Sequence, residues 1–413
     1  MARRENSVEL SVQRFDRCLG CQLCADICPT EAISLPIDSE GKTVPTVDTL
    51  KCKNCGMCRS KCPAIRADYE DTVDSLYAAI SVRNKHKGSS GSVFHEIAES
   101  WINDGGIVWG AAFDADLKLR HVKAVDMDSL KSLYKSKYVQ SDCSGVYAEI
   151  GSLLAKGKKV LFVGCPCQVS AVKNAYVGKF REQLVLIDFL CHGTPPQILF
   201  DICRKHEEEK INGRITEFTF RAKVRKAEHS YSYEYTDNKT GKKKVKSGFA
   251  FEYPYYNAYL KYSIFRDGCY RCPYATVKRV GDLTIGDFWK IEKYSKRFSA
   301  QKGCSLIVTS TNRGKKLFES IRGKLKCEQL PLQAAFDNNG SFREPTKEDE
   351  QIRRKIRESF EMAGHSATIE TYFAQHNMLR SKIYAYAPRK LIELFTYVKA
   401  LIGKRCMEND KKL

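Results

Sequence analysis

The chain has 413 residues, of which 43% are hydrophobic and 11% aromatic. This is enough apolar material for two or three folded domains, and it excludes a disordered protein. The formal net charge of +20 comes without a finger, homeodomain or RNP-type pattern, so we expect no nucleic-acid function. No apolar run reaches the roughly 18 residues of a membrane-spanning helix, and no secretory signal is recognisable, which predicts a cytoplasmic protein.

Two cysteine motifs open the chain. Residues 18–29 read CLGCQLCADICP and residues 52–63 read CKNCGMCRSKCP. Both have the cysteine spacing of bacterial two-cluster ferredoxins, in which the fourth cysteine serves the other cluster. Zinc knuckles also use CxxC pairs, but zinc sites take four ligands in two pairs rather than this repeat. The spacing therefore predicts one [4Fe–4S] cluster held by Cys18, Cys21, Cys24 and Cys62, and another held by Cys52, Cys55, Cys58 and Cys28.

Beyond residue 70 the hydrophobic pattern alternates between strands and helices. It predicts strands at 75–82, 107–114, 117–125, 159–164, 184–190 and 282–289, helices at 91–104 and 145–157, and a hairpin over 231–253 that turns at 238–241. We therefore expect an α/β (α+β) fold with a parallel portion in its sheet. The expected domains are a ferredoxin-type domain at 1–70, an α/β body at 71–345 and a basic helical extension at 346–413.

Further cysteines collect at the predicted strand ends. One strand runs into Cys165 and Cys167 and the next into Cys191, while Cys269 and Cys272 precede the strand at 282–289. Strand ends of such a sheet lie close together and gather ligands, so a third cluster held by Cys167, Cys191, Cys269 and Cys272 is a reasonable hypothesis. The alternative is a set of buried structural thiols, which suits the cysteines without partner spacing: Cys143, Cys203, Cys304, Cys327 and Cys406.

A Gly/Ser turn, KGSSGSVFHEIA, opens the predicted helix at 91–104. Backbone N–H groups at a helix N-terminus favour a phosphate group. An ordinary N-cap serine is the other interpretation of this turn.

Several motifs occur in the order seen in one known family. They are GSSGSVFHEIAESWINDGGIVWGAAFD, SKYVQSD, KKVLFVGCPCQVSAVK, DFLCHGTPP, CYRCPYATVKRVGDLTIGDFW and KGCSLIVTS. In this order they resemble the beta subunit of coenzyme F420-reducing hydrogenase and dehydrogenase, a family that is also similar to a plant reductase of 7-hydroxymethyl chlorophyll. The resemblance implies an FAD flavoprotein with a [4Fe–4S] cluster near the flavin. It supports the third cluster with Cys167 as the ligand, since relatives commonly carry a non-cysteine where Cys165 stands.

The resemblance also implies a flavin site in the α/β body. Candidates for the FAD pyrophosphate are Ser89, Ser90, Gly91 and Ser92, with Lys137 and Tyr138 nearby. Relatives often have two glycines where this chain has Gly91 and Ser92. Other flavin-site candidates are Arg279, Gly281, Asp282 and Asp287, although the two aspartates also suit turns and helix caps.

These cofactors predict an iron–sulfur flavoprotein oxidoreductase, because clusters carry single electrons and FAD carries two. The expected organic acceptor is coenzyme F420-like, or else a sugar-linked or lipid-linked intermediate of polysaccharide biosynthesis, since bacterial members with this fused layout resemble proteins encoded among capsule genes. The expected partner protein is a ferredoxin or a dehydrogenase-like donor. The alternative is an electron-transfer subunit that feeds a partner enzyme and has no substrate of its own.

Residues 350–413 are basic and helical in period. The segment 381–405 has Leu391, Phe395 and Val398 on an apolar side and lysines beside it. Such a helix packs on its own domain or lies on an anionic bilayer. The second hypothesis adds a peripheral membrane contact to the expected cytoplasmic location.

Overall fold

The computed structural model describes residues 17–38, 40–69, 73–83, 90–224 and 229–374. Its centre is an eight-stranded mixed sheet in the order β13-β3-β12-β11-β7-β6-β4-β5. The strands are β3 (Ser75–Ser81), β4 (Ile107–Phe113), β5 (Leu119–Ala124), β6 (Val160–Gly164), β7 (Leu184–Phe189), β11 (Leu283–Asp287), β12 (Ser305–Thr309) and β13 (Leu325–Leu330). The run β11-β7-β6-β4 is parallel and the flanking pairs are antiparallel. The predicted α/β fold and its parallel portion are confirmed.

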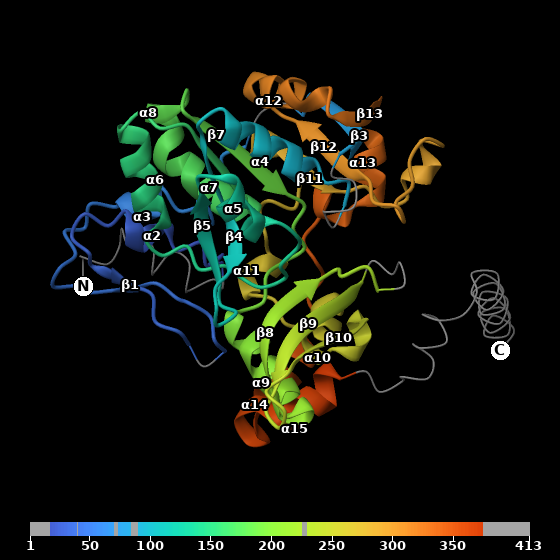
Figure 1. The fold of residues 1–413 in the computed structure, drawn as a ribbon. Coiled ribbons are helices and arrows are strands. Elements are labelled where there is room, and N and C mark those ends of the chain that lie inside the picture. The colour runs from blue at the N-terminus through green and yellow to red at the C-terminus, as the bar shows by residue number, and fades with distance from the viewer. Residues whose placement is uncertain (1–16, 39, 70–72, 84–89, 225–228, 375–413) are drawn as a thin grey trace, which may run out of the picture.

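Helices cover both faces of this sheet (Figure 1). One face packs against α4 (Val93–Asn103), α5 (Met127–Leu130) and α12 (Asn312–Arg322). The other packs against α6 (Val146–Ala155), α7 (Pro166–Val172) and α13 (Gln333–Asn338). The alternation of side chains along a strand explains both layers, because Leu184 and Leu186 of β7 enter one core while Val185 and Ile187 enter the other.

A second, three-stranded sheet lies beside the first (Figure 1). Its strands β8 (Gly213–Phe220), β9 (Ser230–Asp237) and β10 (Lys243–Phe249) are antiparallel in the order β10-β9-β8. With α9 (Gln197–Ile211), α10 (Pro254–Leu260) and α14 (Glu350–Met362) they enclose a core rich in tyrosine and phenylalanine. The predicted hairpin is confirmed as β9 and β10, with Gly241 N–H donating to Asp237 C=O at 2.8 Å.

The N-terminal segment folds as two similar halves, α2 (Leu23–Asp26) and α3 (Met57–Ser60), with a small sheet of β1 (Ile33–Ser34) and β2 (Thr46–Val47). A residue with left-handed backbone precedes each helix, Gln22 at φ 70° and Gly56 at φ 72°. The segment is fastened to the body by Tyr147 Oη, which donates to Cys21 C=O at 2.7 Å, and by Tyr274 Oη, which donates to Pro63 C=O at 2.8 Å.

The described part of the C-terminal extension packs on the body. It continues from α14 through α15 (Gly364–Thr368) and η9 (Ile369–Phe373), and places Ile356, Ile369 and Phe373 in the core of the three-stranded sheet. The amphipathic segment 381–405 lies outside the described residues. Among the described residues, every helix is too short or too polar to cross a bilayer.

The predicted strands and helices of the body are present, each within a few residues of its expected ends. The sequence pattern did not single out β8, β12, β13, α9 or α12. The edge strand β13 shows why, since its sequence LKCEQL has neither a continuous apolar run nor a sustained alternation, and it joins the sheet by pairing with β3.

A buried ion pair joins the end of β7 to the loop before β11. Arg279 Nη2 lies 2.8 Å from Asp188 Oδ1, with side chains only 2% and 0% exposed. The other carboxylate oxygen accepts the N–H groups of Val280 at 3.2 Å and Gly281 at 3.0 Å. This pair therefore holds two parallel strands and their loop in one arrangement.

Replacing Asp188 by Ala should lower the free energy of unfolding by about 3–5 kcal/mol, because it leaves the charge of Arg279 buried without a counter-charge. Denaturant unfolding followed by circular dichroism measures this. Glu319→Ala is the matched control, since Glu319 pairs with Arg322 on the surface with both side chains about half exposed, and it should change stability little. Equal effects of the two variants would contradict the structural role of the buried pair.

Candidate functional site

The eight N-terminal cysteines line two small cavities. Cys18, Cys21, Cys24 and Cys62 surround a cavity of about 20 Å³. Cys28, Cys52, Cys55 and Cys58 surround another of about 20 Å³. Each cavity takes three cysteines from one motif and the fourth from the other motif. This is the crossed arrangement that the spacing predicts for two clusters.

A third small cavity, of about 30 Å³, is lined by Cys167, Cys191, Cys269 and Cys272. Cys165 lines it as well, with its Sγ 3.9 Å from Cys191 Sγ. These two thiols meet because β6 and β7 are parallel neighbours, so the residues that follow them leave the sheet at the same edge. The structure thus brings together the four predicted ligands and the extra thiol.

The chemistry of the three cysteine groups suits iron–sulfur clusters. Burial raises the pKa of the Cys21, Cys24 and Cys167 thiols, and neighbouring cysteines raise it further. Thiolates crowded in this way need a cationic metal to stabilise them. Among the described residues, no three His, Cys, Asp or Glu side chains are arranged to hold a single metal ion.

A large cavity of about 520 Å³ lies next to the third cysteine group. It opens at the carboxyl ends of β6, β7 and β11, the edge at which sheets of this kind bind ligands. Arg221 and His229 of the connection between β8 and β9, and Tyr259 of α10, also line it. Its volume is in the range of cofactor and small-molecule sites.

The four cavities form a row. Leu19 lines both the Cys18 group and the Cys167 group. Cys165, Cys191 and Thr194 line both the Cys167 group and the large cavity. At the far end, Cys24 and Cys62 of the Cys18 group interact electrostatically with Cys58 of the Cys52 group. The arrangement therefore leads from the exposed Cys55 to the large cavity.

Two families match this chain. Residues 17–65 match the 4Fe-4S dicluster domain, and residues 157–333 match the C terminus of the coenzyme F420 hydrogenase/dehydrogenase beta subunit. The dicluster match precedes the beta-subunit match along the chain. These matches support an iron–sulfur electron-transfer protein.

Curated relatives match the chain over short stretches. One of the subunits of the ferredoxin:CoB-CoM heterodisulfide reductase of Methanosarcina mazei is 33% identical over 75 residues, 15% of this chain and 10% of that protein. An uncharacterized ferredoxin of Methanocaldococcus jannaschii is 37% identical over 57 residues, 14% of this chain and 71% of that ferredoxin. The chain therefore spans about a tenth of the length of the reductase protein that it matches.

One solved structure with similarity to this chain belongs to the F420-reducing [NiFe] hydrogenase complex of Methanosarcina barkeri. It superposes with a TM-score of 0.41 at 14% identity, covering 72% of this chain and 91% of that one. A likeness at this level carries no functional argument.

Five of the residues predicted at the flavin site line the large cavity: Ser90, Ser92, Lys137, Tyr138 and Asp287. Ser92 caps α4 with a left-handed backbone, φ 60°, a conformation that favours glycine. The neighbouring Gly91 is required by packing, because a Cβ there would lie 2.3 Å from Ala79 C=O. Ser89 lies outside the described residues.

The other three predicted flavin residues lie in the buried loop before β11. Arg279 lines the third cysteine cavity, and Gly281 N–H donates to Asp188. Asp282 pairs with Arg181 and accepts the Leu186 N–H at 2.9 Å. Their contacts hold β7 and β11 together, and a role for them at the flavin stays a prediction.

Several polar groups that line the cavity were not expected from the sequence. His121 Nε2 donates to Val163 C=O at 3.1 Å, and its Nδ1 accepts the Ser141 hydroxyl at 2.8 Å. Burial lowers the pKa of His121 to about 4, which keeps the ring neutral near pH 7. Gln168 Nε2 donates to the same Ser141 oxygen at 2.8 Å. No motif links these residues, because β5, α7 and the loop at 141 are distant in sequence.

A second unexpected group lies where the three-stranded sheet meets the end of β11. Arg221 pairs with Asp287 and its guanidinium lies 5.5 Å from the centroid of the Trp289 ring. The His229 ring stacks on Trp289 with 5.7 Å between centroids. This group therefore presents a cation and stacked rings to the cavity. Trp289 is the last residue of the motif RVGDLTIGDFW at 279–289, and this was the one signal available in the sequence.

Lys137 is the cation most affected by the cavity. Its Nζ donates to Tyr134 C=O at 2.7 Å. Burial, together with the positive charge of Lys135, lowers the pKa of Lys137 from 10.5 to about 7. Since an anion bound beside Nζ would favour the charged form, this lysine is suited to a phosphate group.

The stability of the protein should depend on pH through Lys137. Between pH 7 and pH 10.5 the unfolded chain keeps a proton on this lysine that the folded chain has lost, so the free energy of unfolding rises with pH in this window. Lys137→Met removes that contribution and should be more stable than the native chain near pH 7, with an advantage that shrinks toward about pH 10. Denaturant unfolding at several pH values measures the difference, with Lys158→Met, a substitution at an exposed lysine on another part of the chain, as control. An advantage independent of pH would contradict the depressed pKa.

Proposed function

We propose that the protein is an FAD- and iron–sulfur-dependent oxidoreductase that passes electrons between ferredoxin-type [4Fe–4S] clusters and FAD, with a third cluster between them, and on to an organic acceptor. The observation that carries the proposal is the row of three cysteine-lined cavities that ends at the large cavity. Clusters supply one-electron chemistry, and a flavin converts it to two-electron chemistry.

The wall between the third cysteine group and the large cavity supports a flavin at this position. Cys191, Gly193 and Thr194 belong to both cavities, so a ring bound at this end lies one layer of protein from the thiols. Gly193 has φ 142°, and a Cβ there would lie 2.2 Å from the Phe265 ring. Only glycine lets the chain run this close to the Phe265 ring, which keeps the wall between the two cavities thin. At another part of the lining, the N-terminus of α4 and Lys137 provide donors for the FAD pyrophosphate.

The remaining lining favours an acceptor with a ring and hydrogen-bonding groups. Arg221, which pairs with Asp287, provides guanidinium N–H groups, while Trp289 and His229 provide faces for stacking. A coenzyme F420-like deazaflavin and a sugar-linked or lipid-linked intermediate of polysaccharide biosynthesis both fit that description. The two classes differ in the ring, since only the deazaflavin stacks over its whole area on aromatic side chains.

The alternative function is an electron-transfer subunit that feeds a partner enzyme. The surface around the exposed Cys55 favours a docking protein in either case. Leu50 is 91% exposed and Met57 42% exposed. The segment 49–66 has no Asp or Glu and contains Lys51, Lys53, Arg59, Lys61 and Arg66. A small apolar patch in a basic surround suits an acidic redox protein such as a ferredoxin.

Turnover by the purified protein alone distinguishes the two functions. Anaerobic preparations should contain about twelve irons and one FAD per chain. Reduced with dithionite, the protein should then reduce a deazaflavin acceptor or a sugar nucleotide acceptor without any partner. Flavin without turnover on either acceptor class would favour the electron-transfer subunit, and about eight irons without flavin would contradict the proposal.

Single cysteine variants test the third cluster. Cys167→Ser should lower the iron content by about four per chain, because it removes a predicted ligand of one cluster. Cys165→Ser should retain the full content, since Cys165 is the spare thiol. Iron and sulfide analysis of both anaerobic preparations measures this. Equal losses in the two variants would contradict the assignment of Cys165, and no loss in either would contradict the third cluster.

A further inference from the structure

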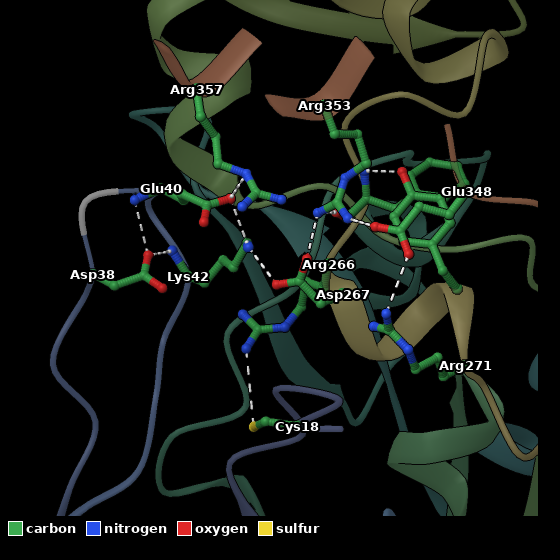
Figure 2. Close-up of polar contacts among 12 residues, drawn as sticks. Cys18, Asp38, Glu40, Lys42, Arg266, Asp267, Arg271, Glu348, Arg353 and Arg357 are labelled. Carbon is green, nitrogen blue, oxygen red and sulfur yellow. Dashed lines mark hydrogen bonds and ion pairs between the residues drawn. The ribbon is translucent and has the colours of Figure 1, made fainter. Parts of the chain in front are cut away.

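Arg266 extends toward Cys18 of the N-terminal domain (Figure 2). It directly precedes α11 (Asp267–Tyr270), the short helix that contains Cys269 of the third group. Its guanidinium extends the other way, toward the N-terminal domain. Nη2 lies 3.9 Å from Cys18 Sγ and donates to Thr43 C=O at 2.7 Å, and Nη1 donates to Gln140 Oε1 at 3.2 Å. One side chain thus spans from one cysteine group to the next.

The positive charge of Arg266 is buried and lacks a carboxylate partner among the described residues. The residue is 2% exposed, and its Nε has no hydrogen-bond partner in that part of the chain. The adjacent carboxylate of Asp267 pairs with Lys42 and Arg353 instead (Figure 2). Burying a cation without a counter-charge is costly, so an anionic group is expected beside this guanidinium. A cluster held by four thiolates, one of them Cys18, is such a group.

The surrounding contacts hold the guanidinium against the loop that carries Cys18 and Cys21. Gly20 lies within that loop, and a Cβ there would come 2.7 Å from Arg266 Cζ. Asp267 is fixed by Lys42 from the N-terminal domain and by Arg353 from α14, which also pairs with Glu348 (Figure 2). The position of Arg266 is therefore set by three parts of the chain.

We propose that Arg266 raises the reduction potential of the cluster held by Cys18, Cys21, Cys24 and Cys62. Reduction adds one negative charge to the cluster, and a buried cation that contacts a ligand sulfur stabilises the reduced form more than the oxidised form. The Cys52 group does not share this effect, because Lys51 and Lys53 beside it are exposed and screened by water and salt. The inference rests on the proposed iron–sulfur function and is independent of the flavin and the acceptor.

The test is an anaerobic redox titration of the intact holoprotein, followed by electron paramagnetic resonance without any acceptor. In Arg266→Gln the midpoint potential of the Cys18 cluster should fall by about 59 mV. For a one-electron couple this corresponds to about a tenfold change in the ratio of oxidised to reduced cluster at a given potential. The cluster of the Cys52 group should keep its potential. Arg266→Lys, which retains the charge, should recover most of the shift. The titration is repeated in Cys167→Ser, which lacks a ligand of the third cluster and should lose the signal of that cluster. A shifted signal that is still present in this background belongs to the Cys18 cluster.

Arg357→Gln is the matched control. Arg357 belongs to the same ion-pair network, but its side chain is 45% exposed and its Nε lies 3.5 Å from Glu40 rather than beside a cysteine (Figure 2). An unchanged potential in Arg266→Gln with full iron content would overturn the proposal, and so would an equal shift in Arg357→Gln. Loss of iron in both Arg266→Gln and Arg266→Met, with normal iron content in Arg266→Lys, would also overturn the proposal. The charge would then be required for assembly of the cluster rather than for its potential. These titrations use no acceptor, so their results do not depend on whether the protein turns over an organic acceptor.

Discussion

The packing of the N-terminal segment on the α/β body is the contact on which the rest of the site depends. Leu19 and Leu23 are buried in the same core as Tyr147 and Tyr274, and the two tyrosine hydroxyls bind carbonyls of the cysteine loops. Electron transfer between two centres needs a short and constant separation. A hydrophobic contact with directed hydrogen bonds provides this better than a flexible linker between independent domains. The same contact makes Leu19 a shared wall of two cysteine cavities.

The parallel part of the sheet positions the cysteines and the cavity-lining residues of the body. Because β6, β7 and β11 run in one direction, their carboxyl ends meet at one edge. The loops from that edge carry cysteines on one side and cavity-lining residues on the other. The three-stranded sheet then covers the edge and contributes Arg221 and His229. A cavity between two sheets can thus have a thiol-rich wall and an aromatic wall that come from separate parts of the chain.

Buried arginines illustrate how environment assigns a role to a residue type. Arg279 has a fully buried carboxylate partner and belongs to the framework of the sheet. Arg266 is as well buried but contacts a thiol, an amide and a carbonyl. The difference lies in the counter-charge, since a cation with a carboxylate is neutralised within the protein and a cation without one favours an anionic ligand. This distinction is not visible in the sequence, where the two arginines flank the same CYRCPY motif.

The sequence by itself determined the N-terminal metal chemistry and most of the sheet. The cysteine spacing specifies the crossed ligand sets, because loops of two and three residues restrict which thiols meet. The apolar runs specify β3, β4, β6, β7 and β11, because buried strands must exclude polar residues, and an alternating pattern specifies the edge strand β5. Only the tertiary structure decided that Arg279, Gly281 and Asp282 stabilise the sheet, that His121, Gln168, Arg221 and Trp289 line the cavity, and that Arg266 reaches Cys18. These contacts join residues that are far apart in the chain, and no local pattern encodes a partner that arrives only when two domains and two sheets pack together.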